Sequence, residues 1–334
     1  MNIAQPYLLF LGDVTDPLAA KTARGIVKWR PDACLGELRL TEQTVSLGLE
    51  PLSLADAKAM GAKTLVIGTA NAGGVIPPSW VETLVQAAQL GFDIASGMHQ
   101  RLGDIPELAS LATQNAIQLF DVRHYDAQLD VGTGKKRQGK RLLTVGTDCS
   151  VGKMFSALAI EKALVDQGCQ ARFKATGQTG ILIEGQGISV DAVVADFISG
   201  AVEKLSPSFT EHEWDIIEGQ GSLFNPSFAG VSLGLLHGAQ PDALVLCHEV
   251  GREHIRHLPH AALPSIEQTI EANLMAARVT NPAVQFVGIC LNTSNISGKE
   301  AKALCLEWSE EFGMPVTDPV RFGVDAIADR VRSL

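Results

Sequence analysis

Residues 142–154, with the sequence LLTVGTDCSVGKM, join an apolar run to a glycine-bounded loop that ends in a lysine. The apolar run predicts a strand, and the spacing of apolar residues after Lys153 predicts a helix. Backbone N–H groups of the loop, the positive end of the helix and the lysine ammonium then converge on one small volume, which suits a pyrophosphate. We therefore predict a phosphate-binding loop made of Gly146, Thr147, Cys149, Ser150, Val151, Gly152, Lys153 and Met154.

This loop departs from the common sequence GxxxxGK followed by Ser or Thr in two ways. Five residues instead of four separate Gly146 from Gly152, and Met154 stands where a hydroxyl normally ligates Mg²⁺. A thioether does not replace that ligand, because the hard Mg²⁺ ion takes oxygen. We expect the loop to bind a phosphorylated carrier without hydrolysing it, and the use of Mg²⁺ stays open.

Two other residues of the loop invite chemical hypotheses. Asp148 either orients a substrate amine or a metal, or hydrogen-bonds the backbone of its own loop. Cys149 lies beside a helix start and a lysine, which lower the pKa of a thiol. No catalytic triad is recognisable around it, so covalent catalysis is the less favoured reading.

A carboxylate follows the next strand that the pattern predicts in this half. Glu218 comes directly after residues 215–217, in the sequence WDIIEGQGSLFNPS, and glycines occupy positions 219 and 221. The carboxyl edge of a parallel sheet is where ligands collect. Glu218 could therefore act as a general base, hold a metal or anchor the glycine loop, and Gln220 lies within substrate reach.

A third loop, KATGQTG at residues 174–180, should emerge at the same edge. Its polar side chains make it a candidate for substrate contact, through Lys174, Thr176, Gln178 and Thr179.

The segment 247–260, CHEVGREHIRHLPH, follows another predicted strand. Arg252, His254 and Arg256 crowd it, and guanidinium groups clasp carboxylates through paired hydrogen bonds. An acidic substrate is our first interpretation, and a polar interface network or a metal site are the alternatives. The HExxH pattern is missing, and we predict no metal ligands. Asn292, after a later strand, either contacts an adenine or ribose or belongs to an ordinary turn.

Apolar periodicity divides the rest of the chain into alternating strands and helices. In the first part it predicts strands at 7–11, 64–67, 93–95 and 117–120, with helices at 17–28, 53–60, 79–90 and 106–115. In the second part it predicts strands at 142–145, 171–174, 215–217, 243–247 and 284–291, with helices at 153–167, 190–205, 266–277, 298–312 and 324–331.

This alternation predicts α/β architecture with parallel sheets. Residues 125–140 are rich in Asp, Gly, Lys and Arg without apolar period and predict a linker. We expect a Rossmann-like domain at 1–130 and a P-loop, doubly wound α/β domain at 131–334. For the glycine-rich loop 68–74 we consider two roles, closure on a ligand and a flexible connection between a strand and a helix.

Composition excludes several classes of protein. The formal net charge of −10 argues against a nucleic-acid partner, and we read the basic run 134–141 as a solvated linker. No apolar segment approaches the roughly 20 residues that span a bilayer, and no secretory signal is visible. Six scattered cysteines without a CxxC pair suit a reducing cytoplasm. Apolar strands in the first part lead us to expect a homo-oligomer.

Three of these motifs together resemble dethiobiotin synthetase: GTDCSVGK looks like its phosphate loop, KATGQTG follows in the corresponding order, and IIEGQGS resembles its next strand and loop. This resemblance covers the second half of the chain. It implies that Lys153 meets phosphates and that Glu218 lies near a metal. That enzyme has Thr at the position of Met154, which counts against its ATP-dependent chemistry here.

A second resemblance covers almost the whole chain. GTANAGG, SGMHQRL, GTDCSVGKM, ATGQTG, EGQGSL and HEVGREHI are similar to a family of P-loop proteins with an N-terminal Rossmann-like domain. Its genes tend to lie beside those of dipeptide epimerases, and it includes D-glutamate N-acetyltransferases. The family carries Met at the position of Met154. The resemblance implies acetyl transfer from acetyl-CoA to an acidic amino acid, as a step of D-amino acid catabolism.

We therefore expect an N-acetyltransferase that acts on an acidic amino acid, with D-glutamate as first choice. Lys153 binds the carrier, Glu218 is the first candidate for the general base and Asp148 the second. Arg252 and Arg256 are candidates for the substrate carboxylates. The alternatives are a Mg²⁺- and ATP-dependent ligase or kinase and a non-catalytic sensor of nucleotide or acyl-CoA.

Overall fold

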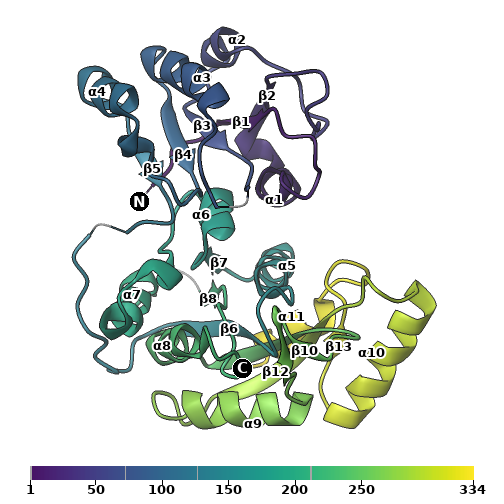
Figure 1. Cartoon of the computed structure of the whole chain (residues 1–334). Coiled ribbons are helices and arrows are strands. Elements are labelled where there is room, and N and C mark those ends of the chain that lie inside the picture. The colour runs from purple at the N-terminus through teal and green to yellow at the C-terminus, as the bar shows by residue number, and fades with distance from the viewer. Residues whose placement is uncertain (1, 72, 126, 211–212) are drawn as a thin grey trace. The chain divides into compact units, whose positions relative to one another are not determined.

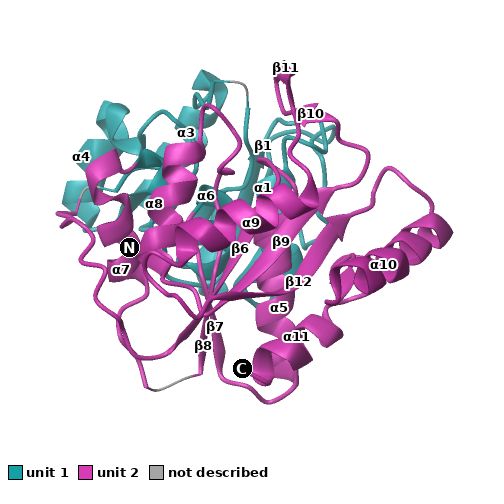
Figure 2. Ribbon diagram, turned by 90° about the horizontal axis from the view of Figure 1, so that it is seen from below, with its two compact units in different colours: residues 1–126, 177–192 teal, residues 127–176, 193–334 magenta. Residues whose placement is uncertain are grey.

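The structure is a computed structural model that describes residues 2–71, 73–125, 127–210 and 213–334. The chain forms two compact units, which Figure 2 shows in different colours. The first comprises residues 1–126 and 177–192, and the second comprises residues 127–176 and 193–334. The chain thus enters the second unit, returns to the first for one short segment, and then completes the second.

The first unit contains a five-stranded parallel sheet in the order β2-β1-β3-β4-β5. Neighbouring strands in this order arise from successive strand–helix units, as the alternating sequence predicts. The strands are β1 (Tyr7–Gly12), β2 (Cys34–Arg39), β3 (Thr64–Ile67), β4 (Asp93–Ser96) and β5 (Leu119–Asp121).

Helices cover this sheet on both faces (Figure 1). They are α1 (Lys21–Trp29), α2 (Leu54–Ala59), α3 (Pro78–Gln89), α4 (Pro106–Asn115) and α6 (Gln178–Glu184). Side chains alternate along each strand, so Leu8 and Phe10 share one face and pack in a core with Trp80 and Leu84 of α3. Helix α1 connects β1 to β2, which lies on the side of β1 away from β3. A right-handed crossover in this direction places α1 on the face of the sheet opposite α3, where it contacts α6.

The second unit contains a six-stranded parallel sheet in the order β13-β12-β9-β6-β8-β7. Its strands are β6 (Lys140–Gly146), β7 (Ala171–Lys174), β8 (Trp214–Ile217), β9 (Ala243–Glu249), β12 (Gln285–Asn292) and β13 (Val316–Thr317). A short antiparallel pair, β10 (His254–Ile255) and β11 (Leu258–Ala262), follows β9.

The helices of this unit are α5 (Lys153–Asp166), α7 (Ile198–Leu205), α8 (Ala229–Ala239), α9 (Ile266–Ala277), α10 (Gly298–Phe312) and α11 (Asp325–Arg332). Helices α7, α8 and α9 contact one another in series, and α5 contacts α11. After β6 the chain continues to β7, which lies beyond β8 on one side of β6, whereas β9 is the neighbour of β6 on the other side. The carboxyl ends of β6 and β9 therefore flank a topological switch point, where doubly wound sheets bind ligands.

The α/β fold class with parallel sheets is confirmed. One predicted element is wrong: residues 190–205 do not form a continuous helix. They form two short 3-10 turns, Val190–Ala192 and Ala195–Phe197, followed by α7. The reason is that the chain passes from the first unit to the second between residues 192 and 193. The described part of the chain has no helix with the length and apolar character needed to cross a membrane.

Candidate functional site

The loop between β6 and α5 folds around the ammonium group of Lys153. Ser150 and Gly152 have positive φ values of 57° and 105°, which turn the backbone sharply before the helix begins. The Lys153 residue is 6% exposed, and its Nζ donates a hydrogen bond to the backbone carbonyl of Asp148 at 2.8 Å. Burial lowers the pKa of this lysine. A bound anion would favour the charged form of this lysine.

The loop after β8 presses against this lysine. Gly219 N–H donates to Thr144 Oγ1 of β6 at 3.0 Å. A Cβ atom at Gly219 would lie 1.7 Å from the Thr144 carbonyl oxygen and 2.9 Å from Lys153 Cδ. Only glycine fits between the two strands here, and the close approach sets Glu218 beside the phosphate-binding loop.

Glu218, Thr176 and Gln220 form one hydrogen-bonded cluster. The Thr176 N–H donates to Glu218 Oε2 at 2.9 Å, and Thr176 Oγ1 donates to the Glu218 carbonyl at 2.6 Å. Gln220 Nε2 donates to Thr176 Oγ1 at 3.3 Å. Glu218 is 4% exposed. The structure thus brings together three of the residues that we predicted from separate motifs.

Asp148 is surrounded by donors. Asn225 Nδ2 donates to its Oδ1 at 2.9 Å, while Arg252 Nη1 and Arg256 N–H donate to its Oδ2 at 3.0 Å and 2.7 Å. Burial alone would raise the pKa of Asp148, but these hydrogen bonds outweigh it and lower the pKa. A carboxylate held in this way is a weak base, and it serves to fix the loop to the segment after β9.

The three basic residues predicted to bind substrate, of which Arg252 and Arg256 were the candidates for its carboxylates, differ in their surroundings. Arg252 binds Asp148, the Cys149 carbonyl at 2.7 Å and the carboxylate of Glu249. His254 is the first residue of β10 and Arg256 follows that strand, and both residues are exposed. Arg252 is therefore committed to the protein, whereas Arg256 and His254 face solvent close to the loop.

Two further side chains, one within the phosphate-binding loop and one beside it, could take part in chemistry. Burial raises the pKa of the Cys149 thiol despite the nearby Lys153, which does not favour a thiolate nucleophile. His248, at the end of β9, is hydrogen-bonded through Nδ1 to Thr147 Oγ1 at 3.1 Å. His248 and Asn225 lie within the segments 247–260 and 214–227, but we did not single them out, because their contacts with the loop come from segments distant in sequence.

The remaining residues of the KATGQTG loop do not join this cluster in the second unit. The Lys174 ammonium lies 3.5 Å from Asp215 of β8. Gln178 and Thr179 belong to the first unit, where Gln178 Nε2 donates to Ser189 Oγ at 2.9 Å and Thr179 Oγ1 pairs with Thr22 Oγ1 at 3.4 Å. Sequence alone could not show that the chain changes unit inside this loop.

A cavity of about 380 Å³ lies beside the phosphate-binding loop. Loop residues 150–152, Phe155 of α5, Asn292 of β12 and Arg321 contribute to its lining. Asn292, for which the sequence left open a contact with an adenine or ribose or an ordinary turn, thus lines a cavity beside the loop. No group of three or more His, Cys, Asp and Glu side chains that could hold a metal occurs among the described residues.

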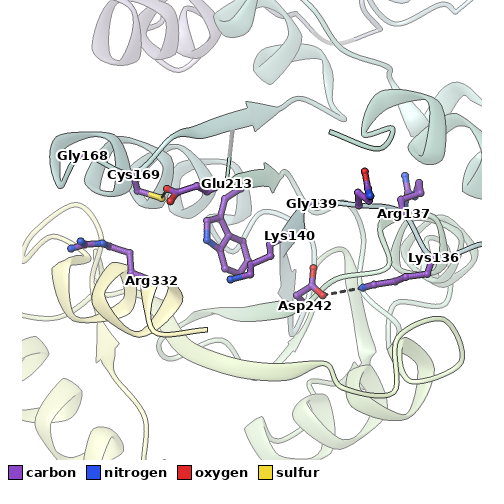
Figure 3. A pocket seen from close by; sticks show the side chains of 11 residues that line it. Lys136, Arg137, Gly139, Lys140, Gly168, Cys169, Glu213, Asp242 and Arg332 are labelled. Atoms are coloured by element: carbon purple, nitrogen blue, oxygen red, sulfur yellow. Dashed lines mark hydrogen bonds and ion pairs between the residues drawn. The ribbon is translucent and has the colours of Figure 1, made fainter. Parts of the chain in front are cut away.

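A larger cavity, about 780 Å³, opens at the opposite edge of the same sheet (Figure 3). It is lined by residues at the amino ends of β6, β8 and β9, among them Lys140 and Glu213, and Lys136 Nζ lies 3.1 Å from Asp242 Oδ1 there. None of the predicted site residues lines it. Since parallel α/β sheets bind ligands at their carboxyl edge, we place the candidate site at the phosphate-binding loop.

Comparison with known proteins gives consistent matches over the whole chain. A family model described as the P-loop domain of DUF1611, a domain of unknown function, matches residues 130–328, and its Rossmann-like partner DUF1611_N matches residues 39–125. A D-glutamate N-acetyltransferase of Pseudoalteromonas sp is 53% identical over 327 residues, 98% of each chain. One from Tritonibacter scottomollicae is 48% identical over 332 residues, 99% of this chain and 100% of the other.

A solved structure shares the complete fold. It is the crystal structure of a DUF1611 family protein from Anabaena variabilis, with a TM-score of 0.84 and 34% sequence identity. The match covers 99% of this chain and 100% of that chain.

Proposed function

The chain belongs to the DUF1611 family, and from this membership we propose that it is a D-glutamate N-acetyltransferase that uses acetyl-CoA. The observation that carries the proposal is the near-full-length identity of 53% and 48% to two relatives that bear this name. The site supports it, because a loop built for an anion carries Met154 at the position of the usual magnesium hydroxyl. Coenzyme A contains a diphosphate that acetyl transfer leaves intact.

Residues 146–154 would hold the diphosphate, with the Lys153 ammonium and the backbone N–H groups at the start of α5 as donors. Gly146 and Gly219 allow the necessary close packing, since a Cβ at Gly146 would lie 3.2 Å from Lys153 Nζ. The residues present therefore fit this part of coenzyme A.

We assign the role of general base to Glu218. The amine of an amino acid is protonated at neutral pH, and Glu218 would take the proton that blocks its lone pair. The freed nitrogen then forms a bond to the thioester carbonyl carbon. The carbon–sulfur bond breaks, and the extra proton on the nitrogen passes to the leaving thiolate, which gives the amide and free coenzyme A. Glu218 is favoured over Asp148 because hydrogen bonds from Asn225, Arg252 and the Arg256 N–H lower the pKa of Asp148, which makes it a weak base.

The exposed Arg256 and His254 are the candidates for the substrate carboxylates, together with Arg252 as the residue that fixes their loop. A guanidinium group suits this task because its paired donors match the geometry of a carboxylate. Two carboxylates distinguish glutamate from neutral amino acids, so this cationic segment supports an acidic acceptor.

The test is to mix the protein with acetyl-CoA and a panel of D- and L-amino acids and to follow the release of free thiol. We expect the highest rate with D-glutamate, no dependence on ATP and no loss of rate in EDTA. Release of ADP that depends on the substrate would favour the ligase reading instead, and failure of D-glutamate to release thiol would refute the proposed activity.

The variant Glu218→Gln tests the base. We expect kcat to fall by about 10²- to 10⁴-fold, the usual contribution of general base catalysis. Glu253→Gln is the matched control, because Glu253 is exposed in the segment after β9. An unchanged rate in Glu218→Gln would show that another group removes the proton.

A further inference from the structure

The cavity of about 380 Å³ lies on one side of the phosphate-binding loop, and Glu218 lies on the other. The cavity is lined from the ends of β12 and β13, whereas Glu218 follows β8, and β6 with its loop lies between them in the sheet order. Strands β12 and β8 are three positions apart, about 14 Å at the usual strand spacing. A long molecule held by its diphosphate at the loop after β6 can therefore reach Glu218 with one end and the cavity with the other.

Asp318 fixes the rim of this cavity. Its Oδ2 accepts from the N–H and Oγ1 of Thr293 at 3.1 Å and 2.5 Å, which ties the rim to the end of β12. Its Oδ1 accepts from the N–H groups of Val320 and Arg321 at 2.8 Å and 3.1 Å. Asp318 is 3% exposed. These hydrogen bonds fix the backbone of Val320 and Arg321 at the rim of the cavity.

The lining combines apolar side chains with one cation. Val151, Phe155 and Val320 supply apolar surface, and Val320 is 63% exposed. Among the described residues that line the cavity, Arg321 is the one basic side chain. Its Nη1 donates to the Ile296 carbonyl at 3.0 Å, which holds the guanidinium in place and leaves other N–H groups for a ligand.

We propose that this cavity binds the adenosine of coenzyme A and that Arg321 binds its 3′-phosphate, so that Arg321 sets the specificity for coenzyme A over dephospho-coenzyme A. The inference rests on the proposed use of acetyl-CoA. A flat base suits the apolar lining, and a guanidinium group binds phosphate oxygens through paired charge-assisted hydrogen bonds. The 3′-phosphate is the group that separates coenzyme A from other adenosine diphosphate carriers.

Calorimetric titration of the full-length protein with coenzyme A and with dephospho-coenzyme A tests this assignment. We expect the wild type to bind coenzyme A about 10- to 100-fold more tightly, the range for hydrogen bonds to a charged group. Arg321→Ala should weaken the binding of coenzyme A by that factor and leave the Kd of dephospho-coenzyme A unchanged. The KM values of the two acetylated donors should change in parallel, with little change in kcat.

Arg330→Ala is the matched control. Arg330 Nη1 also donates to a backbone carbonyl, that of Gly313 at 3.2 Å, but Arg330 does not line the cavity. Equal affinity of the wild type for both carriers, or equal weakening of both by Arg321→Ala, would overturn the assignment, and so would a failure to bind either carrier. Selective binding of coenzyme A without acetyl transfer to any acceptor would refute the proposed activity and leave the role of Arg321 standing.

Discussion

Glu218 and Asp148 are both carboxylates in loops that follow strands of one sheet, and the sequence offered both as bases. Their partners separate them. Asp148 accepts hydrogen bonds from Asn225, Arg252 and the Arg256 N–H, which lower its pKa, and Glu218 accepts one from the Thr176 N–H. Motifs place residue types at a sheet edge, but the donors that set a pKa come from distant segments. The sequence could therefore predict that residues of separate motifs meet at the carboxyl edge of the sheet, but not which donors surround each carboxylate.

His248 carries a pH dependence that can be measured as stability. Burial, followed by the positive charge of Arg252, lowers the pKa of His248 to about 4. The unfolded chain protonates this histidine near pH 6.5, whereas the folded protein keeps it neutral. Between these values the unfolded state binds more protons, so the free energy of unfolding falls as the pH falls from about 6.5 to 4.

We expect His248 to account for on the order of 3 kcal/mol of this fall. Urea unfolding of the wild type and of His248→Asn at several pH values measures it, because asparagine does not titrate. The variant should lose less stability than the wild type between pH 7 and 4. Parallel curves for the two proteins would contradict the prediction.

At the scale of elements, Arg137 joins the ends of two helices. Its guanidinium donates to the carbonyls of Glu203, Ser206, Gly238 and Ala239, at the carboxyl ends of α7 and α8. Burial lowers the pKa of Arg137 to about 10, so it stays charged at neutral pH. The terminal carbonyls of a helix carry partial negative charge that a cation stabilises. We predicted a solvated linker for residues 134–141, but the half-buried Arg137 makes a structural contact.

Arg137→Ala should therefore lower the free energy of unfolding by at least about 3 kcal/mol, since several buried carbonyls lose a charged donor. Arg137→Lys should recover only part of this loss, because one ammonium cannot reach both helix ends. Lys135→Ala, two residues away in the same basic run and exposed, is the control. If urea unfolding gives equal stability for Arg137→Ala and Lys135→Ala, the two helices do not depend on this contact.

Helix α8 shows why part of the fold escaped sequence analysis. It contains Gly230, Gly234 and Gly238, which disfavour a helix by intrinsic propensity. A Cβ at Gly234 would lie 2.8 Å from Ile198 Cγ2, and one at Gly238 would lie 2.4 Å from the Ser199 carbonyl oxygen. Contact with α7 requires glycine at positions 234 and 238, so tertiary packing overrides propensity there.

Strands and helices with a strong apolar period were predicted closely, as for β3, β7, α4, α9 and α10. The weaker elements were missed. Strand β2 contains the buried Glu37, whose carboxylate accepts from Ser46 Oγ at 2.8 Å and Leu47 N–H at 2.7 Å. Strand β13 has only two residues. The charged Glu37 interrupts the apolar alternation of β2, and β13 is too short to show an alternation.

At the scale of the whole molecule, residues 177–192 complete the first unit from a distant part of the chain. Helices α2, α3 and α4 cover one face of its sheet, and α1 lies on the other with α6 beside it. The Ile3 N–H donates to the Gly185 carbonyl at 2.7 Å, and Arg30 pairs with Glu184 at 2.9 Å. The sequence predicted the alternation of elements but not this return, which long-range packing alone decides.

A polypeptide of residues 1–125 should consequently be less stable than one in which a flexible Gly/Ser linker joins it to residues 177–192. Leu182 and Ile183 are fully or almost fully buried, and Ile183 Cδ1 lies 3.4 Å from the position of a Cβ at Gly25 in α1. Burial of two such side chains contributes about 3 to 6 kcal/mol, which urea unfolding of the two polypeptides can measure.

In the linked form, Ile183→Ala should lower the free energy of unfolding by about 2 to 5 kcal/mol. Glu184→Gln should lower it by at most about 1 kcal/mol, because the ion pair with Arg30 is partly exposed. Equal stability with and without the added segment would mean that the first unit needs no second helix on the α1 face, and that the chain returns there for another reason.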